Sequence, residues 1–309
     1  FLHVDFHPAH AQRVKESKIL SLHKCLPESV KVAASYNAFE AKPMSSILYI
    51  TQIHIEPGAL KRLADECQRN HISRPLIVTD AALVKSGTVE LALCQLGGRE
   101  YEIFDRVLPD PEIAIVEDCM RVYREGGHDG LIGLGGGSAI DIAKSVAAYA
   151  GYHGALEDMF GVDQVPRKGP PLIAIPTTAG TGSEVTNVAI LSDKVAQLKK
   201  GIVSDYLLPD VALVSPQMTL TCPRSVTAAS GVDALVHALE SYLSVNASPI
   251  TDSLAIGAIK LIARSLPKAY ANGANLQARE DMATASLMAG MAFGNAGVGA
   301  VHALAYPLG

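Results

Sequence analysis

Three side chains that could ligate one metal ion lie in the last third of the sequence. Asp233 and His237 stand four residues apart within GVDALVHALESY, so on a helix they share one face. His302 follows in GAVHALAYPLG, 65 residues beyond His237, as a third ligand. Such an Asp-x-x-x-His pair also occurs by chance, and His302 could simply pack between helices. Oxygen and imidazole ligands suit Fe(II), Zn(II) or Mn(II), and the residue types alone do not select one.

A glycine-rich turn points to a second kind of chemistry, the binding of a pyrophosphate. DGLIGLGGGS (129–138) predicts a strand that runs into the turn, and IDIAKSVAAYAGY (140–152) predicts a helix after it. Glycines let the backbone approach a ligand, and the helix N-terminus presents free N–H groups. The spacing departs from G-x-G-x-x-G, because Ser138 stands at the third glycine position. A merely tight connection is the alternative, but Asp141 and Lys144 on one face of the helix weigh against it.

Two further segments fit a dinucleotide. Asp80 ends the predicted strand RPLIVTD (74–80), where a carboxylate can accept a hydrogen bond from a ribose 2′-OH and repel a 2′-phosphate. This predicts NAD rather than NADP, although TDAAL also fits a helix N-cap. The loop 176–184, PTTAGTGSE, packs four hydroxyls among small residues just after another strand. It could surround phosphate and nicotinamide with donors, or be a polar turn.

The elements that must position these residues fall into two parts. From Met44 to about residue 222, short apolar runs such as SSILYITQIHI, PPLIAIP, GIVSD and VALVSP alternate with helical patterns. This alternation predicts a parallel or mixed sheet with helices on both faces. After Pro223 only helical patterns occur. We therefore predict an N-terminal extension of unclear role (1–43), an NAD-binding α/β domain (44–222) and a helical metal-binding domain (223–309).

Composition limits the classes of function. The 309 residues carry 26 Lys plus Arg against 31 Asp plus Glu, a formal net charge of −5, which argues against a nucleic-acid partner. No apolar run reaches the ~18–20 residues that a membrane span needs. The five cysteines are scattered without C-x-x-C spacing, so a disulfide framework is not expected. These observations favour a cytoplasmic protein.

The motifs GGGSAIDIAK, PTTAGTGSEVT, GVDALVHALESYLS and NAGVGAVHALAYPLG occur in this order. Together they resemble the iron-containing (group III) alcohol dehydrogenase family from about residue 45 to 309. The resemblance implies a Rossmann-like α/β domain that binds NAD and an all-α domain that holds Fe(II), with Zn(II) as the other metal, and an active site in the cleft between them. This architecture is shared with dehydroquinate synthase.

The resemblance also implies roles for individual residues. It makes Asp233, His237 and His302 three of four metal ligands. The cofactor contacts that we expect from the resemblance and from the residues themselves are Asp80, Gly136, Gly137, Ser138, Asp141, Thr177, Thr178, Ser183, Lys200, Thr219 and Leu220.

Two features depart from the family pattern. The family's fourth ligand is a histidine some fourteen residues beyond the third, whereas this sequence ends seven residues after His302. Either the C-terminal domain is truncated, which we expect, or three side chains form a weaker metal site. Some members carry a histidine four residues after the third ligand, and here that residue is Tyr306, which could hydrogen-bond substrate or water. No other catalytic side chain beyond the metal site is expected.

The resulting hypothesis is NAD-dependent, Fe(II)-dependent oxidation of a small primary alcohol or diol to its aldehyde, with the metal as Lewis acid and hydride passing to nicotinamide. A hydroxyacid–oxoacid transhydrogenase of the same family is an alternative. A lyase like dehydroquinate synthase would need a cluster of Lys and Arg near the metal, and residues 223–309 offer few. A truncated, non-catalytic NAD-binding remnant is a third alternative. A homodimer is expected from the resemblance.

Overall fold

Six short apolar segments form one parallel sheet, as their continuous hydrophobic runs predict. In the computed structural model, which describes residues 47–48, 52–194 and 197–305, the strand order is β1-β9-β6-β4-β2-β3. Every neighbouring pair is parallel. The strands are β1 (Gln52–Ile55), β2 (Pro75–Val78), β3 (Glu102–Phe104), β4 (Gly130–Gly135), β6 (Leu172–Pro176) and β9 (Val211–Val214).

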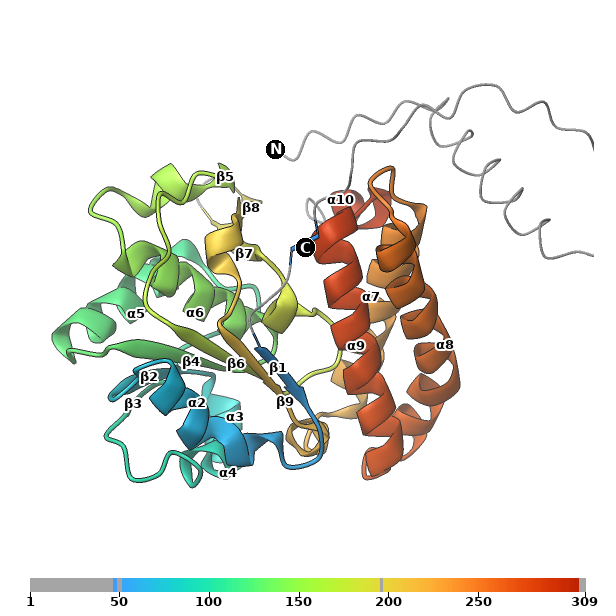
Figure 1. The fold of residues 1–309 in the computed structure, drawn as a ribbon, viewed down its shortest axis with the longest axis horizontal. Helices are drawn as coiled ribbons and strands as arrows, with labels where there is room; N and C mark the ends of the chain where they lie inside the picture. The colour runs from blue at the N-terminus through green and yellow to red at the C-terminus, as the bar shows by residue number, and fades with distance from the viewer. Residues whose placement is uncertain (1–46, 49–51, 195–196, 306–309) are drawn as a thin grey trace, which may run out of the picture.

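Helices cover both faces of this sheet (Figure 1). One layer contains α5 (Ile113–Glu125) and α6 (Gly137–Ala150), and the other contains α2 (Leu63–Arg69), α3 (Ala81–Lys85) and α4 (Glu90–Leu93). The pleat sends Leu76 and Val78 into the first core and Ile77 into the second. The two cores explain why these strands read as unbroken apolar runs rather than as alternating ones.

The glycine-rich strand β4 lets helix α6 approach the sheet closely. A Cβ at Gly133 would lie 3.0 Å from the Cβ of Ala143 and 3.2 Å from the Cα of Ile140. Such contacts are tighter than ordinary van der Waals distances, so a larger residue would push α6 away from the strand. The sequence therefore fixes how closely the helix after the glycine turn lies on the sheet.

Three strands form a second, smaller sheet. It contains β5 (Gly161–Val162), β8 (Leu198–Val203) and β7 (Val188–Asp193), in that order, with β7 and β8 antiparallel. The predicted strand GIVSD therefore corresponds to the end of β8 and lies outside the main sheet. Short 3-10 helices complete this half of the chain: η1 (Ala59–Arg62), η2 (Leu156–Met159), η3 (Ser183–Val185), η4 (Asp205–Leu207) and η5 (Pro216–Thr219).

The remaining described residues are helical, as predicted. They form α7 (Arg224–Leu243), α8 (Pro249–Ala271), α9 (Leu276–Ala296) and α10 (Ala300–Ala305). Alanines such as Ala234, Ala255 and Ala289 dominate the core of α7, α8 and α9, so the three helices can pack closely. The predicted α/β plus all-α fold is confirmed. We propose a domain boundary near residue 222, where strands give way to helices.

The helical part packs on the end of the sheet through α9. Val185, Ala212, Val214, Ala283 and Leu287 form a buried cluster from both parts of the chain. Figure 1 shows α9 beside β1 and β9. Within the described residues, no helix combines the length and apolar character that a membrane crossing requires. The extension 1–43 and Tyr306 lie outside the described residues, so the predictions for them stay predictions.

Candidate active site

The glycine turn joins β4 to α6 at the carboxyl edge of the sheet. Gly135 ends the strand, Gly136 has extended backbone and Gly137 begins the helix. The N-cap residue of α6, Gly136, makes no side-chain hydrogen bond to the first N–H groups of the helix. Asp80 follows β2, which pairs in parallel with β4, so the carboxylate lies at the same edge. This is the arrangement that binds dinucleotides in parallel sheets.

The loop 176–184, called the threonine-rich loop below, packs directly on the glycine turn. A Cβ at Gly136 would lie 3.6 Å from the side chain of Thr178, and a Cβ at Gly137 would lie 2.7 Å from the Cγ2 of Thr181. The N–H of Thr177 donates to the carbonyl of Gly135 at 2.9 Å. Glycine at position 137 is therefore required by close approach. The glycine turn and the threonine-rich loop, which we predicted from the sequence to bind one cofactor, thus lie in contact.

A buried charged network lies beneath these segments. Asp141 accepts a hydrogen bond from the hydroxyl of Ser183 and another, at 3.0 Å, from the N–H of Ile190. Burial raises the pKa of Asp141, although the nearby Lys144 charge and the two hydrogen bonds oppose the shift. Both carboxylate oxygens of Asp141 thus accept hydrogen bonds from other groups of the protein. Asp141 and Ser183 join α6 to the loop, and direct cofactor contact by either residue stays a prediction.

Lys144 continues this network. Its Nζ donates to the Oγ1 of Thr186 at 3.1 Å and to the carbonyl of Val188 at 3.0 Å. Burial lowers the pKa of Lys144 to about 8, against the attraction of Asp141 and Glu184. Burial also raises the pKa of the Glu184 carboxyl to about 7. The loop is thus anchored to α6 by charged and polar groups that water does not reach.

The other predicted cofactor residues have protein partners of their own. Asp80 Oδ1 accepts a hydrogen bond from the N–H of Leu83 at 2.9 Å, so the carboxylate caps α3. The Lys200 Nζ pairs with Asp193 at 2.7 Å within the small sheet. The hydroxyl of Thr219 donates to the carbonyl of Pro216 at 2.8 Å, and Leu220 is exposed. Their roles toward NAD stay predictions.

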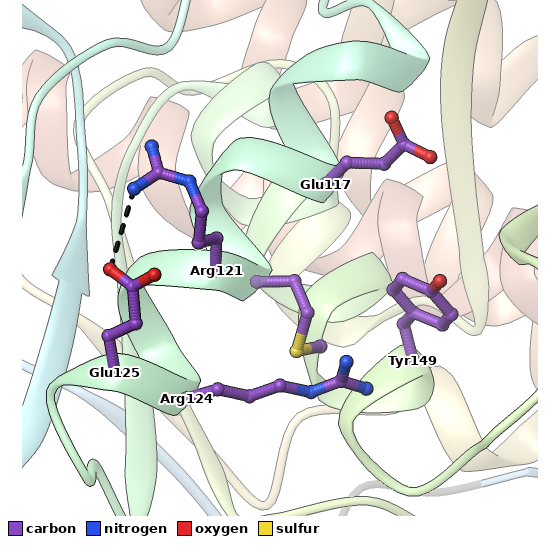
Figure 2. A pocket seen from close by; sticks show the side chains of 6 residues that line it. Glu117, Arg121, Arg124, Glu125 and Tyr149 are labelled. Atoms are coloured by element: carbon purple, nitrogen blue, oxygen red, sulfur yellow. Dashed lines mark hydrogen bonds and ion pairs between the residues drawn. The ribbon is translucent and has the colours of Figure 1, made fainter.

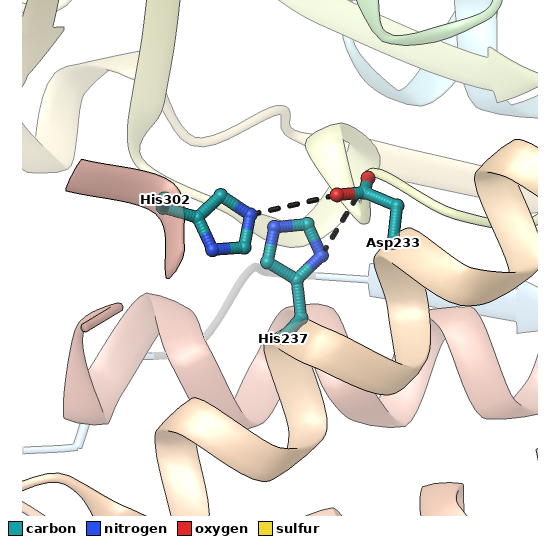
Figure 3. Close-up of side chains that lie close together, drawn as sticks. All are labelled: Asp233, His237 and His302. Carbon is teal, nitrogen blue, oxygen red and sulfur yellow. Dashed lines mark ion pairs between the residues drawn. The ribbon is translucent and has the colours of Figure 1, made fainter. Parts of the chain in front are cut away.

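The three predicted metal ligands come together (Figure 3). Ligand atoms of Asp233, His237 and His302 all lie within 4.8 Å of one another. The Asp233 carboxylate is 3.8 Å from His237 Nδ1 and 3.5 Å from His302 Nε2. The two imidazole rings stack with centroids 4.4 Å apart. One oxygen and two nitrogen donors at this spacing fit a single first-row divalent ion.

The electrostatics of His237 and Asp233 suit metal binding, whereas burial acts to lower the pKa of the His302 ring but its hydrogen bonds to Asp233 and Glu240 raise it. Burial lowers the pKa of His237 to about 4, despite the attraction of Asp233, so this ring is neutral at physiological pH. Burial of Asp233 acts to raise its pKa, but the hydrogen bond from His302 and the two histidine charges lower it below the usual range. A neutral imidazole beside an ionised carboxylate is the protonation state that a metal ion needs.

The threonine-rich loop also contacts the metal-binding helices. A Cβ at Gly180 would lie 2.5 Å from the Cβ of Ser230 in α7, and one at Gly182 would lie 2.6 Å from the Cα of Gly290 in α9. The carbonyl of Gly180 is 3.4 Å from His237 Nδ1. One loop therefore touches the glycine turn on one side and the metal cluster on the other. The loop therefore connects the segment predicted to bind a cofactor with the cluster predicted to bind a metal.

Sequence reasoning missed two residues of the metal cluster. Glu240 Oε2 accepts a hydrogen bond from His302 Nδ1 at 2.5 Å. Phe293 stacks on His237 with centroids 4.1 Å apart. Glu240 follows Asp233 by seven residues and His237 by three, so it lies on the same helix face, and this spacing could have identified it. Phe293 offered no comparable signal, because its contact depends on how α9 packs against α7.

A separate surface pocket lies over α5 and α6 (Figure 2). Arg121 pairs there with Glu125 at 3.4 Å and with Asp118 at 2.5 Å, and the Arg124 guanidinium lies 5.5 Å from the centre of the Tyr149 ring. Arg121, Arg124 and Glu125 thus have partners within the protein. None of the residues predicted for cofactor or metal lines it.

Comparison with known proteins identifies the family. The family model for iron-containing alcohol dehydrogenase matches residues 51–216, and the model for the C-terminal part of Fe-containing alcohol dehydrogenases matches residues 227–309. Long-chain-alcohol dehydrogenase 1 of Geobacillus thermodenitrificans is 47% identical over 271 residues, which are 86% of this chain and 68% of that protein.

Two solved structures are similar to this chain in both sequence and fold. A 1,3-propanediol oxidoreductase is 42% identical with a TM-score of 0.83, over 85% of this chain and 69% of that one. The sulfoacetaldehyde reductase of Bifidobacterium kashiwanohense, in complex with NAD+, is 34% identical with a TM-score of 0.82, over 86% of this chain and 71% of that one. This chain thus spans about two thirds of its relatives' length. It belongs to the iron-containing alcohol dehydrogenase family and is an oxidoreductase of the NAD-dependent, iron-containing type.

Proposed function

We propose that this chain interconverts a small primary alcohol or diol and its aldehyde, with NAD as hydride carrier and Fe(II) as the required metal. The observation that carries the proposal is the position of the loop 176–184. It touches the glycine turn through Thr178 and Thr181 and the metal-binding helices through Gly180 and Gly182. The similarity to a long-chain-alcohol dehydrogenase and to a 1,3-propanediol oxidoreductase supports an alcohol or diol as substrate.

The chain's own residues supply binding and orientation. Asp233, His237 and His302 would hold the iron, and the uncapped N-terminus of α6 would hold the pyrophosphate of NAD. When bound, iron would supply Lewis acidity toward an alcohol oxygen and NAD would supply a hydride acceptor. Phe293 stacked on His237 keeps water from one face of that ring. A homodimer and a cytoplasmic location stay part of the proposal.

The test is anaerobic loading of the metal-free protein with Fe(II), followed by measurement of metal per chain and of NADH formed with ethanol, 1,2-propanediol and 1,3-propanediol. We expect about one metal per chain and NADH formation. His237→Ala should lose both metal and turnover while it still binds NAD. The matched control is His153→Ala, because His153 is exposed and lies outside the cluster.

Other outcomes would overturn the proposal in different ways. Bound NAD without metal or turnover would identify a non-catalytic remnant. Metal binding without NADH formation, together with hydride exchange between a hydroxyacid and an oxoacid, would identify a transhydrogenase. Equal turnover with His237→Ala would remove His237 from the metal site.

A further inference from the structure

We propose that Glu240 is a positioning residue that holds the His302 imidazole with Nε2 directed toward Asp233 and His237. The inference rests on the proposed metal site and concerns a residue that contacts the predicted ligand His302 rather than the metal. Glu240 lies on α7 with Asp233 and His237, whereas His302 lies on α10. Glu240 thus connects the helix that carries two predicted ligands to the helix that carries the third.

The contacts of Glu240 are divided between its two oxygens. Oε2 accepts from His302 Nδ1 at 2.5 Å, and Oε1 accepts from the backbone N–H of Val301 at 2.6 Å. A Cβ added at Gly299 would lie 3.1 Å from Oε1, so the carboxylate also packs against the start of α10. Glu240 is only 8% exposed. One oxygen therefore docks the backbone of α10, and the other orients the ring.

The chemistry of a carboxylate determines the tautomer of the ring. An ionised carboxylate only accepts hydrogen bonds, and Glu240 Oε2 lies 2.5 Å from Nδ1 whereas Asp233 Oδ1 lies 3.5 Å from Nε2, so the proton of a neutral His302 ring is held on Nδ1. In that tautomer Nε2, the ring nitrogen that faces Asp233, carries a lone pair rather than a proton. Histidines that ligate metals commonly donate their other N–H to a carboxylate in this way. Glu240 thus presents Nε2 in the form that can bind a metal.

Glu240→Gln separates orientation of the ring from docking of the helix. If the amide oxygen of the substituted side chain faces Val301, its NH₂ faces His302 Nδ1 and favours the tautomer with the proton on Nε2. If the amide is reversed, the NH₂ faces the N–H of Val301 and docking is lost. Either arrangement weakens metal binding, whereas a purely structural role for Glu240 would leave the tautomer unchanged.

The matched control is Asp281→Asn. Asp281 is also a mostly buried carboxylate that joins two helices, since it accepts from Ser265 and, at 2.8 Å, from Arg264. No predicted metal ligand is among its hydrogen-bond partners. Its substitution should lower thermal stability without changing metal affinity.

The experiment titrates metal-free full chain with Co(II) alone and follows its visible absorption bands. We expect Glu240→Gln to bind Co(II) about 10- to 100-fold more weakly than wild type, with shifted bands and unchanged NAD affinity. Asp281→Asn should bind Co(II) like wild type. Equal Co(II) affinity in wild type and Glu240→Gln would overturn the proposal.

A second measurement does not depend on metal. The ¹⁵N shifts of the His302 ring, recorded on metal-free protein at alkaline pH, report which nitrogen carries the proton. We expect Nδ1–H in wild type and a shift toward Nε2–H in Glu240→Gln. Nε2–H in wild type would overturn the positioning role. Nδ1–H in a wild-type protein that fails to bind Co(II) would instead sustain the positioning role and refute the proposed metal-dependent function.

Discussion

The hydroxyl of Ser183 donates a hydrogen bond to Oδ1 of Asp141, which lies 42 residues earlier in the chain. Asp141 belongs to the helix after the glycine turn, and Ser183 belongs to the loop that touches the metal-binding helices. Together with the bond from Ile190 to the other carboxylate oxygen, this contact fixes the loop relative to the turn. It is fully internal, so we expect it to influence NAD binding only through the position of the loop.

Ser183→Ala should therefore weaken NAD binding without removing the metal. Loss of one buried hydrogen bond to a charged group costs about 1.5–3 kcal/mol when the acceptor stays behind, and only part of it would reach the cofactor. We expect the KM for NAD to rise about 10-fold, with metal per chain unchanged. Ser145→Ala is the control, because the Ser145 hydroxyl donates within α6 to the carbonyl of Asp141 at 2.8 Å. An equal KM in the two variants would contradict this role of Ser183.

Gly182→Ala should separate the loop from α9. Gly182 has φ +62°, and a Cβ there would lie 2.6 Å from the Cα of Gly290. The left-handed backbone alone costs a non-glycine residue about 1 kcal/mol, and the clash should add to it, for a total of about 2–4 kcal/mol. Thermal and urea unfolding measure the loss of stability.

Gly127→Ala provides the matched control for that experiment. Gly127 has φ +63°, but nothing lies within 4 Å of an added Cβ. It should lose only the conformational part, about 1 kcal/mol. The difference between the two variants isolates the contact between loop and helix, and equal losses would show that this contact contributes nothing.

Glu184→Gln should change how stability depends on pH. Burial raises the pKa of Glu184 to about 7, above the ordinary 4.5, so the folded chain holds more protons than the unfolded chain between these two pH values. The contribution of Glu184 to stability is therefore present below pH 4.5 and is lost as pH rises to about 7. Urea unfolding at pH 4.5, 6 and 8 should show the variant gaining about 1–3 kcal/mol on wild type as pH rises.

Glu117→Gln is the control, because it makes the same chemical change at an exposed position on α5. If Glu184→Gln instead loses stability at pH 8, the attraction between Glu184 and Lys144 exceeds the free-energy cost of burying the Glu184 charge, and this prediction is wrong.

Sequence patterns predicted the parts of this molecule that depend on local rules. The strand–glycine–helix segment at 130–150 follows from hydrophobic runs and glycine, and the Asp233–His237 pair follows from helix periodicity. The sequence placed β8 among the strands but could not tell which sheet it joins, because its pairing with β7 is a separate antiparallel contact.

Contacts between distant segments were the parts that could not be predicted. Lysines are rarely fully buried, yet the side chain of Lys144 is, and its Nζ donates to Thr186 and to the carbonyl of Val188. Glu240 shares a helix face with Asp233 and His237, but its partner His302 arrives from another helix. Such pairings depend on how whole elements dock, which local periodicity does not encode.

Asp80 has two roles that a pair of substitutions can separate. Its carboxylate caps α3 through Leu83, and it lies at the sheet edge where the adenosine ribose of NAD is expected. Asp80→Ser keeps a capping oxygen but removes the charge, whereas Asp80→Gly removes both at a cost of only a few tenths of a kcal/mol to the helix. If the carboxylate repels a 2′-phosphate, both variants should raise kcat/KM for NADP relative to NAD by about 10-fold or more. If neither variant changes the ratio of kcat/KM for the two cofactors, the carboxylate acts only as the cap of α3, because the charge was the one property that both substitutions removed.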